Sequence, residues 1–130
     1  MIVAGNVVDI LFRDVKVFGI KEIYRDLKRI PDGDVKTERI TIKVKKPSTE
    51  TYWKKCFAEV NLCVPYKNGI TDTVRLTELE RKASKLLESV GSFDGTTYRY
   101  SVETNQEDDS SLKCDYVNCR ILFEVLNVKL

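Results

Sequence analysis

Apolar residues recur at helical spacing near the start of the chain. The pattern over residues 6–18 predicts a short helix, with Asn6 as its cap and Gly19 as the residue that ends it. The next stretch, residues 20–33, fits either a further helical turn or a first strand, and residues 31–34 supply turn chemistry. The apolar positions of the helix are Val8, Leu11, Phe12 and Val15.

Residues 73–90 carry the clearest periodic pattern, an apolar stripe opposite a charged face. Such a stripe predicts a helix that lies on a sheet. Asp72 or Thr73 can cap its start, and Gly91 suits the left-handed residue just past its end. The stripe consists of Leu76, Leu79, Ala83, Leu86, Leu87 and Val90.

Alternating apolar and polar residues predict four strands. In the last of them the even positions Leu122, Leu126 and Val128 are apolar as well, which predicts that part of this strand is covered on both faces. The predicted segments are a strand at 38–46, a loop at 47–55, a strand at 56–64, a strand at about 96–104, a polar connection at 104–111 and a strand at about 114–128.

This order of elements predicts an α+β fold, a mostly antiparallel sheet of about four strands with two helices packed on one face. No linker or repeat interrupts the chain, so residues 1–130 are expected to form a single domain. No stretch approaches the ~20 apolar residues that span a bilayer, and no secretory signal is evident, which predicts an intracellular protein without membrane association.

The residues that most catalytic sites need are missing. The chain has no histidine, which removes Cys-His and Ser-His-Asp catalysis and the common zinc triads, and it has no glycine-rich phosphate loop. The four cysteines are not spaced for zinc and are expected to be reduced, buried thiols. We therefore expect no catalytic residue, no metal and no cofactor. The cysteines are Cys56, Cys63, Cys114 and Cys119.

The charges are unevenly distributed, although the net charge is only +2. Residues 1–55 hold 13 Lys and Arg against 8 Asp and Glu, whereas residues 56–130 hold 9 against 12. A basic loop region and an acidic loop each lie at the tip of a predicted hairpin. The candidate interaction residues are Lys43, Lys45, Lys46, Tyr52, Trp53, Lys54 and Lys55 in the basic region and Glu107, Asp108 and Asp109 in the acidic one.

These two regions allow three interpretations. Opposite charges on opposite flanks suit a head-to-tail contact between copies, which closes into a ring if the rotation allows. Basic residues interleaved with Tyr52 and Trp53 could instead form a nucleic-acid or regulatory binding module, although the near balance of charge makes nucleic acid an unfavoured partner. The third interpretation is two independently solvated hairpin tips.

The apolar strand FAEVNLCVPY, the helix LTELERKASKLLESV and the closing strand VNCRILFEVLNV resemble the small tail completion, or tail terminator, proteins of tailed bacteriophages. The resemblance covers residues 6–128 and rests on the order of the elements. It implies a structural, non-enzymatic virion protein that forms a ring, usually a hexamer, and joins the tail tube to the head connector. It also implies a location in the bacterial cytoplasm and then in the virion.

Two alternatives to this assembly function stay open. One is the nucleic-acid or regulatory module that uses the loop at residues 43–55. The other is a thiol enzyme that uses Cys63 or Cys114, which is disfavoured because no histidine is present to activate a thiolate.

Overall fold

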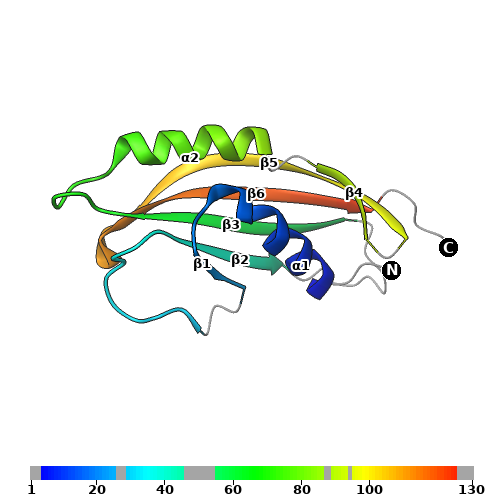
Figure 1. Cartoon of the computed structure of the whole chain (residues 1–130), viewed down its shortest axis with the longest axis horizontal. Coiled ribbons are helices and arrows are strands. Elements are labelled where there is room, and N and C mark those ends of the chain that lie inside the picture. The colour runs from blue at the N-terminus through cyan, green and yellow to red at the C-terminus, as the bar shows by residue number, and fades with distance from the viewer. Residues whose placement is uncertain (1–3, 26–28, 46–54, 87–88, 94, 126–130) are drawn as a thin grey trace.

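The computed structural model describes residues 4–25, 29–45, 55–86, 89–93 and 95–125. Within these ranges the chain forms two α-helices and one six-stranded sheet with the strand order β1-β2-β3-β6-β5-β4 (Figure 1). The first two strands are parallel, and all other neighbours are antiparallel. The strands are β1 (Glu22–Tyr24), β2 (Arg39–Lys45), β3 (Lys55–Pro65), β4 (Ser89–Phe93), β5 (Thr96–Asp109) and β6 (Cys114–Val125).

The α+β class is confirmed, but the predicted number of about four strands is wrong. The sheet gains β1 and β4 at its two edges, and both are too short to show a clear alternation. β1 resolves the ambiguous segment at residues 20–33 as partly strand. Because β1 runs parallel to β2, the sheet is mixed rather than wholly antiparallel.

Helix α1 (Ala4–Asp14) continues into a 3₁₀ turn at Val15–Phe18. Gly19 ends it in the left-handed conformation, with φ of 71°, and its N–H donates to the carbonyl of Lys16, as predicted. The predicted cap at Asn6 is wrong, because the helix already begins at Ala4 and Asn6 lies inside it.

Helix α2 (Thr73–Leu86) is shorter than the predicted 73–90. Asp72 caps it, since its carboxylate accepts from the backbone N–H of Arg75 at 3.2 Å. Gly91 is not the residue after the helix, as was predicted, but the centre of β4 opposite Tyr98. A Cβ atom at this position would lie 2.7 Å from the hydroxyl oxygen of Tyr98, so the buried Tyr98 side chain, which lies against Gly91, favours glycine there.

The predicted polar connection at residues 104–111 is also mostly strand. β5 continues to Asp109, and only the short 3₁₀ turn Ser110–Leu112 separates it from β6. The cross-strand ladder with β6 explains this, because it pairs every residue from Tyr98 to Asp109. A local sequence pattern cannot show hydrogen bonds to a partner strand.

Both helices pack on the same face of the sheet, as predicted. Residues of α1, such as Ile10 and Leu11, and of α2, such as Leu76 and Leu79, belong to one buried cluster with the strands. The helices lie at opposite sides of this face, α2 over β5 and β6 and α1 over β2 (Figure 1). The strands contribute Ile40, Ile42, Cys56, Ala58, Val60, Leu62, Val64, Tyr98, Tyr100, Val117, Cys119, Ile121 and Phe123.

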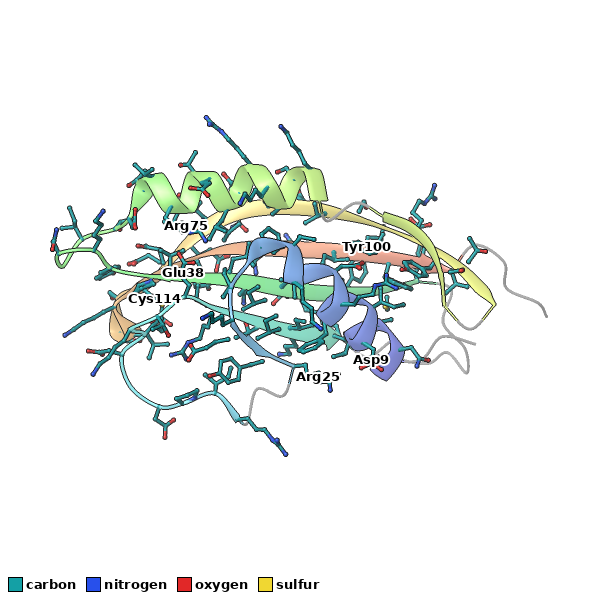
Figure 2. The ribbon with its side chains drawn as sticks, in the orientation of Figure 1. Asp9, Arg25, Glu38, Arg75, Tyr100 and Cys114 are labelled. Carbon is teal, nitrogen blue, oxygen red and sulfur yellow. The ribbon has the colours of Figure 1, made fainter. Side chains whose placement is uncertain are left out.

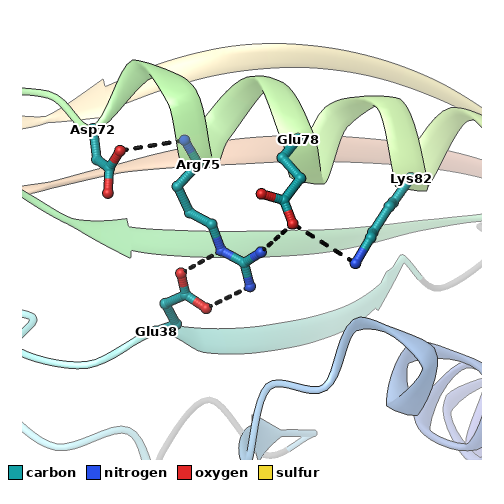
Figure 3. Close-up of polar contacts among 5 residues, drawn as sticks. All are labelled: Glu38, Asp72, Arg75, Glu78 and Lys82. Atoms are coloured by element: carbon teal, nitrogen blue, oxygen red, sulfur yellow. Dashed lines mark hydrogen bonds and ion pairs between the residues drawn. The ribbon is translucent and has the colours of Figure 1, made fainter.

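Polar contacts join each helix to the sheet. The guanidinium of Arg75 on α2 binds both carboxylate oxygens of Glu38, which directly precedes β2, at 2.6 and 2.8 Å (Figure 3). Its third nitrogen donates to Glu78 at 2.9 Å. On α1, Asp14 accepts a hydrogen bond from the buried hydroxyl of Tyr100. The covered face is therefore held together by polar contacts at its rim as well as by its apolar interior.

Candidate interaction surfaces

The predicted basic region lies at the end of the sheet where β2 finishes and β3 begins. Lys45 on β2 and Lys55 on β3 are exposed there, and we call these two residues the basic end; Lys43 is also exposed but lies nearer the middle of the sheet, level with Glu59. Lys45 forms an ion pair with Glu59 at 3.5 Å. The other predicted members, Lys46, Tyr52, Trp53 and Lys54, lie outside the described residues.

The predicted acidic residues form the last three positions of β5, so they belong to a strand and not to a loop. We call Glu107, Asp108 and Asp109 the acidic end. Each carboxylate accepts a hydrogen bond from a hydroxyl group, supplied by Tyr116, Tyr66 and Ser111 respectively. These bonds orient the carboxylates without neutralising them, and the bond from Tyr116 lowers the pKa of Glu107. The hydroxyl donors therefore hold all three carboxylates in place, and the bond from Tyr116 favours the ionised form of Glu107.

The two ends lie at opposite limits of the β3–β6 ladder. Lys55 opens β3, whereas Asp109 is level with Cys114, which pairs with the last residue of β3, Pro65. At ~3.3 Å per residue, the ten steps along β3 place the ends about 33 Å apart. Figure 2 labels Cys114 near the acidic end and Tyr100 toward the other end. Salt screens exposed charges beyond about 10 Å, so the two ends do not attract each other within one molecule.

The second face of the sheet carries neither helix, and we call it the open face. In β3 the odd-numbered residues lie on it and the even-numbered ones on the covered face, as their alternating burial shows. Its central residues form three rows across β2, β3, β6 and β5. The amide row is Thr41, Asn61, Asn118 and Asn105; the charged row is Lys43, Glu59, Arg120 and Glu103; the apolar row is Lys45, Phe57, Leu122 and Ser101.

The sequence pattern predicted a half-buried strand at residues 38–46 but did not identify this face as a candidate interaction surface. The apolar even positions of β6 predicted that this strand is covered on both sides near Leu122, but Leu122 is only half-buried and its neighbour Phe57 is 59% exposed. The prediction about Leu126 and Val128 falls outside the described residues. The alternation of Lys43 and Lys45 with Ile42 and Val44 was a usable signal for the exposed side of β2. That the opposite charges of the charged row lie side by side became apparent only from the strand register.

The cysteines are free thiols. Cys56 and Cys119 are buried in the core, and Cys63 and Cys114 lie on the open-face side near the acidic end. Burial raises the pKa of Cys63 to about 12 and that of Cys114 to about 11. A nucleophilic cysteine needs a lowered pKa, so the environment of both thiols opposes thiolate chemistry.

Among the described residues, no group of three His, Cys, Asp or Glu side chains is placed to hold a metal ion. No described helix combines the length and apolarity that crossing a bilayer requires. No protein-family model matches the chain, and no curated protein sequence matches it either. The arrangement of charge and exposed side chains is therefore the evidence on which a function can be argued.

Proposed function

We propose that this chain is a structural assembly subunit that associates with copies of itself through its oppositely charged ends. The single observation that carries the proposal is the placement of the basic and acidic ends at opposite limits of the sheet. Such a subunit presents complementary surfaces that cannot meet within one molecule. Copies then associate head to tail, and a closing rotation produces a ring.

The ends suit association between copies better than the edges of the sheet do. β4 pairs only with residues 96–100, so residues 101–109 of β5 have no paired strand on their outer side among the described residues, but this edge carries the charged residues Glu103, Glu107 and Asp109, which oppose the addition of a further strand. The acidic end is also preorganised, because three hydroxyl donors fix its carboxylates before any partner arrives. Preorganised groups lose less side-chain entropy on association.

The resemblance to phage tail completion proteins gives this assembly its biological setting. In that setting the chain is a tail terminator or head–tail joining subunit of a phage or prophage, and its ring contacts tail-tube and head-connector proteins. The ring is a hexamer by the same resemblance. The order on which the resemblance rests is retained in α1, β2, β3, α2, β5 and β6, with β1 and β4 added at the edges, and the two helices on one face are compatible with this assignment. The raised pKa values of Cys63 and Cys114 speak against the thiol-enzyme alternative.

The test is the molar mass by light scattering, over a range of concentration and salt. The wild-type protein is expected to form a discrete closed oligomer that weakens as salt rises. Two variants each reverse the charge of one end. Lys45→Glu/Lys55→Glu gives a molecule with two acidic ends, and Glu107→Lys/Asp109→Lys gives one with two basic ends. Each alone is expected to be impaired in ring formation, and an equimolar mixture restores it because unlike ends can again alternate.

The control is Arg81→Glu/Lys85→Glu, an equal charge change at exposed positions of α2, away from both ends. It should leave the oligomer unchanged. A wild-type protein that stays monomeric at every concentration in low salt would refute self-association through the ends. Steep salt-dependent binding of oligonucleotides by that monomer would support the nucleic-acid module instead.

A further inference from the structure

The charged row of the open face has an order that a second copy can match. From β2 to β5 it runs Lys43, Glu59, Arg120, Glu103, so the signs alternate across four neighbouring strands. Read in the opposite direction, the signs are reversed at every position. A copy turned over by a two-fold axis parallel to the strands, between β3 and β6, therefore places Lys43 opposite Glu103 and Glu59 opposite Arg120.

We propose that the open face binds the open face of a second copy across this two-fold axis. The contact is isologous, so each pairing occurs twice. It is a second interface, separate from the end-to-end contact proposed above. Copies that associate through their ends would also pair face to face through it.

The apolar row supplies the centre of this interface. Phe57 and Leu122 are direct cross-strand neighbours on β3 and β6, the two strands that flank the axis. The two-fold operation sets Phe57 over Leu122 of the second copy, and Leu122 over its Phe57, so four apolar side chains meet on the axis. Phe57 is 59% exposed in the single chain, whereas Leu122 is half-buried, so Phe57 has the larger surface to bury in this contact. Buried aromatic side chains at the centre of an interface commonly dominate its affinity.

The amide row flanks the same axis with groups that can both donate and accept. Asn118 donates to Asn61 at 2.8 Å within the chain. The two-fold operation sets the partly exposed Asn61 opposite Asn118 of the second copy; because Asn118 is only 6% exposed, this row contributes uncharged surface rather than new hydrogen bonds. None of the three rows brings like charges face to face.

The geometry of stacked sheets is compatible with these pairings. Two aligned sheets pack about 10 Å apart with strands crossing at about 30° because each sheet is twisted. The outer strands β2 and β5 lie about 7 Å from the axis at a strand spacing of ~4.8 Å, so the crossing shifts their facing residues by about 4 Å. This is less than the ~6.6 Å between rows, and Lys and Glu side chains can span it.

The size of the face predicts a weak dimer. Four strands and about seven residues of length cover roughly 500 Å² on each copy. About 1,000 Å² from both copies lies at the lower limit for a specific interface. We therefore expect a dimer that dissociates on dilution.

The test uses two single variants on the outer strands, where Lys43 and Glu103 are exposed. Lys43→Glu sets Glu against Glu103 twice in its homodimer, and Glu103→Lys sets Lys against Lys43 twice. Each variant alone is expected to dimerise at least tenfold more weakly than wild type. In the heterodimer every facing pair is again of opposite sign, so an equimolar mixture regains wild-type affinity by sedimentation velocity.

Phe57→Ser separates this contact from the ends. It changes no charge and alters an exposed side chain, so the fold is retained, as a thermal melt would verify. It should weaken the dimer at least tenfold while end-to-end association persists, whereas Glu107→Lys/Asp109→Lys, which alters none of the three rows, should have the opposite effect. The proposal is overturned if Phe57→Ser dimerises like wild type, or if the mixture of charge variants associates no more tightly than either variant alone.

Discussion

The ion pair between Arg75 and Glu38 is expected to be the strongest single polar contact between α2 and the sheet. It is bidentate, with distances of 2.6 and 2.8 Å, and the two side chains are only 24% and 29% exposed. A net hydrogen bond to a charged group contributes about 1.5–3 kcal/mol, whereas an exposed ion pair contributes about 0–1 kcal/mol. Because both side chains are partly exposed, we expect a coupling energy between these two ranges, at roughly 1–2 kcal/mol.

A double-mutant cycle with Arg75→Met and Glu38→Gln measures this coupling without deleting the side-chain stems. The entropy of unfolding is about 2.1 cal/mol/K per residue, so this chain should unfold with about 0.27 kcal/mol/K. A loss of about 1.5 kcal/mol then lowers Tm by roughly 5 °C. Chemical denaturation gives the free energies, and repeating the cycle in high salt should reduce the coupling only modestly because the pair is half-buried.

The neighbouring pair Lys82–Glu78 is the matched control for this cycle. Its charged atoms are 3.8 Å apart and its side chains are 45% and 50% exposed, so its coupling should not exceed about 0.5 kcal/mol. If the two cycles give equal coupling energies, burial and bidentate geometry do not strengthen the Arg75 contact, and the reasoning is wrong.

Two further predictions concern the covered face. Gly91→Ala should destabilise the protein by about 1–3 kcal/mol, because its Cβ would lie 2.7 Å from the Tyr98 hydroxyl oxygen. The control is Gly5→Ala in α1, whose Cβ would meet no atom within 4 Å, and it should be neutral or stabilising in the same urea titration. Burial, with Asp108 alongside, raises the pKa of Asp115 above 3.8, so the folded protein binds this proton more tightly than the unfolded chain does. Its ionisation thus costs stability above the raised pKa, and Asp115→Asn should be more stable than wild type at pH 7, with the difference shrinking toward pH 4; a difference independent of pH would contradict this.

Patterns that depend on one segment were readable in the sequence. The stripe of Leu76, Leu79 and Ala83 placed α2 on the sheet, and the alternation around Ile40 and Ile42 placed β2. Gly19 ended the first helix as its conformational freedom suggests. These features follow from local periodicity and backbone chemistry, which need no knowledge of distant residues.

Features set by pairing between distant segments were not readable. Val90 continues the helical period of α2, yet it lies in β4, because pairing with Arg99 of β5 outweighs the local preference. The polar residues after Thr104 look like a loop, but their ladder with β6 extends the strand to Asp109. The placement of the two charged ends at opposite limits of the sheet also depends on this register, which the charge counts alone could not supply.

The same register explains how the open face can be stable in a single chain and still bind a second copy. Each charge in the charged row already has an opposite neighbour on the adjacent strand, so this row carries no net charge. Charges arranged in this way add little net affinity when they are buried, but they penalise a misaligned partner strongly. The affinity must then come from Phe57 and Leu122, and the charges must fix the alignment. Substitutions at Phe57 should therefore change how tightly copies bind, whereas substitutions at Lys43 and Glu103 should change which copies bind each other.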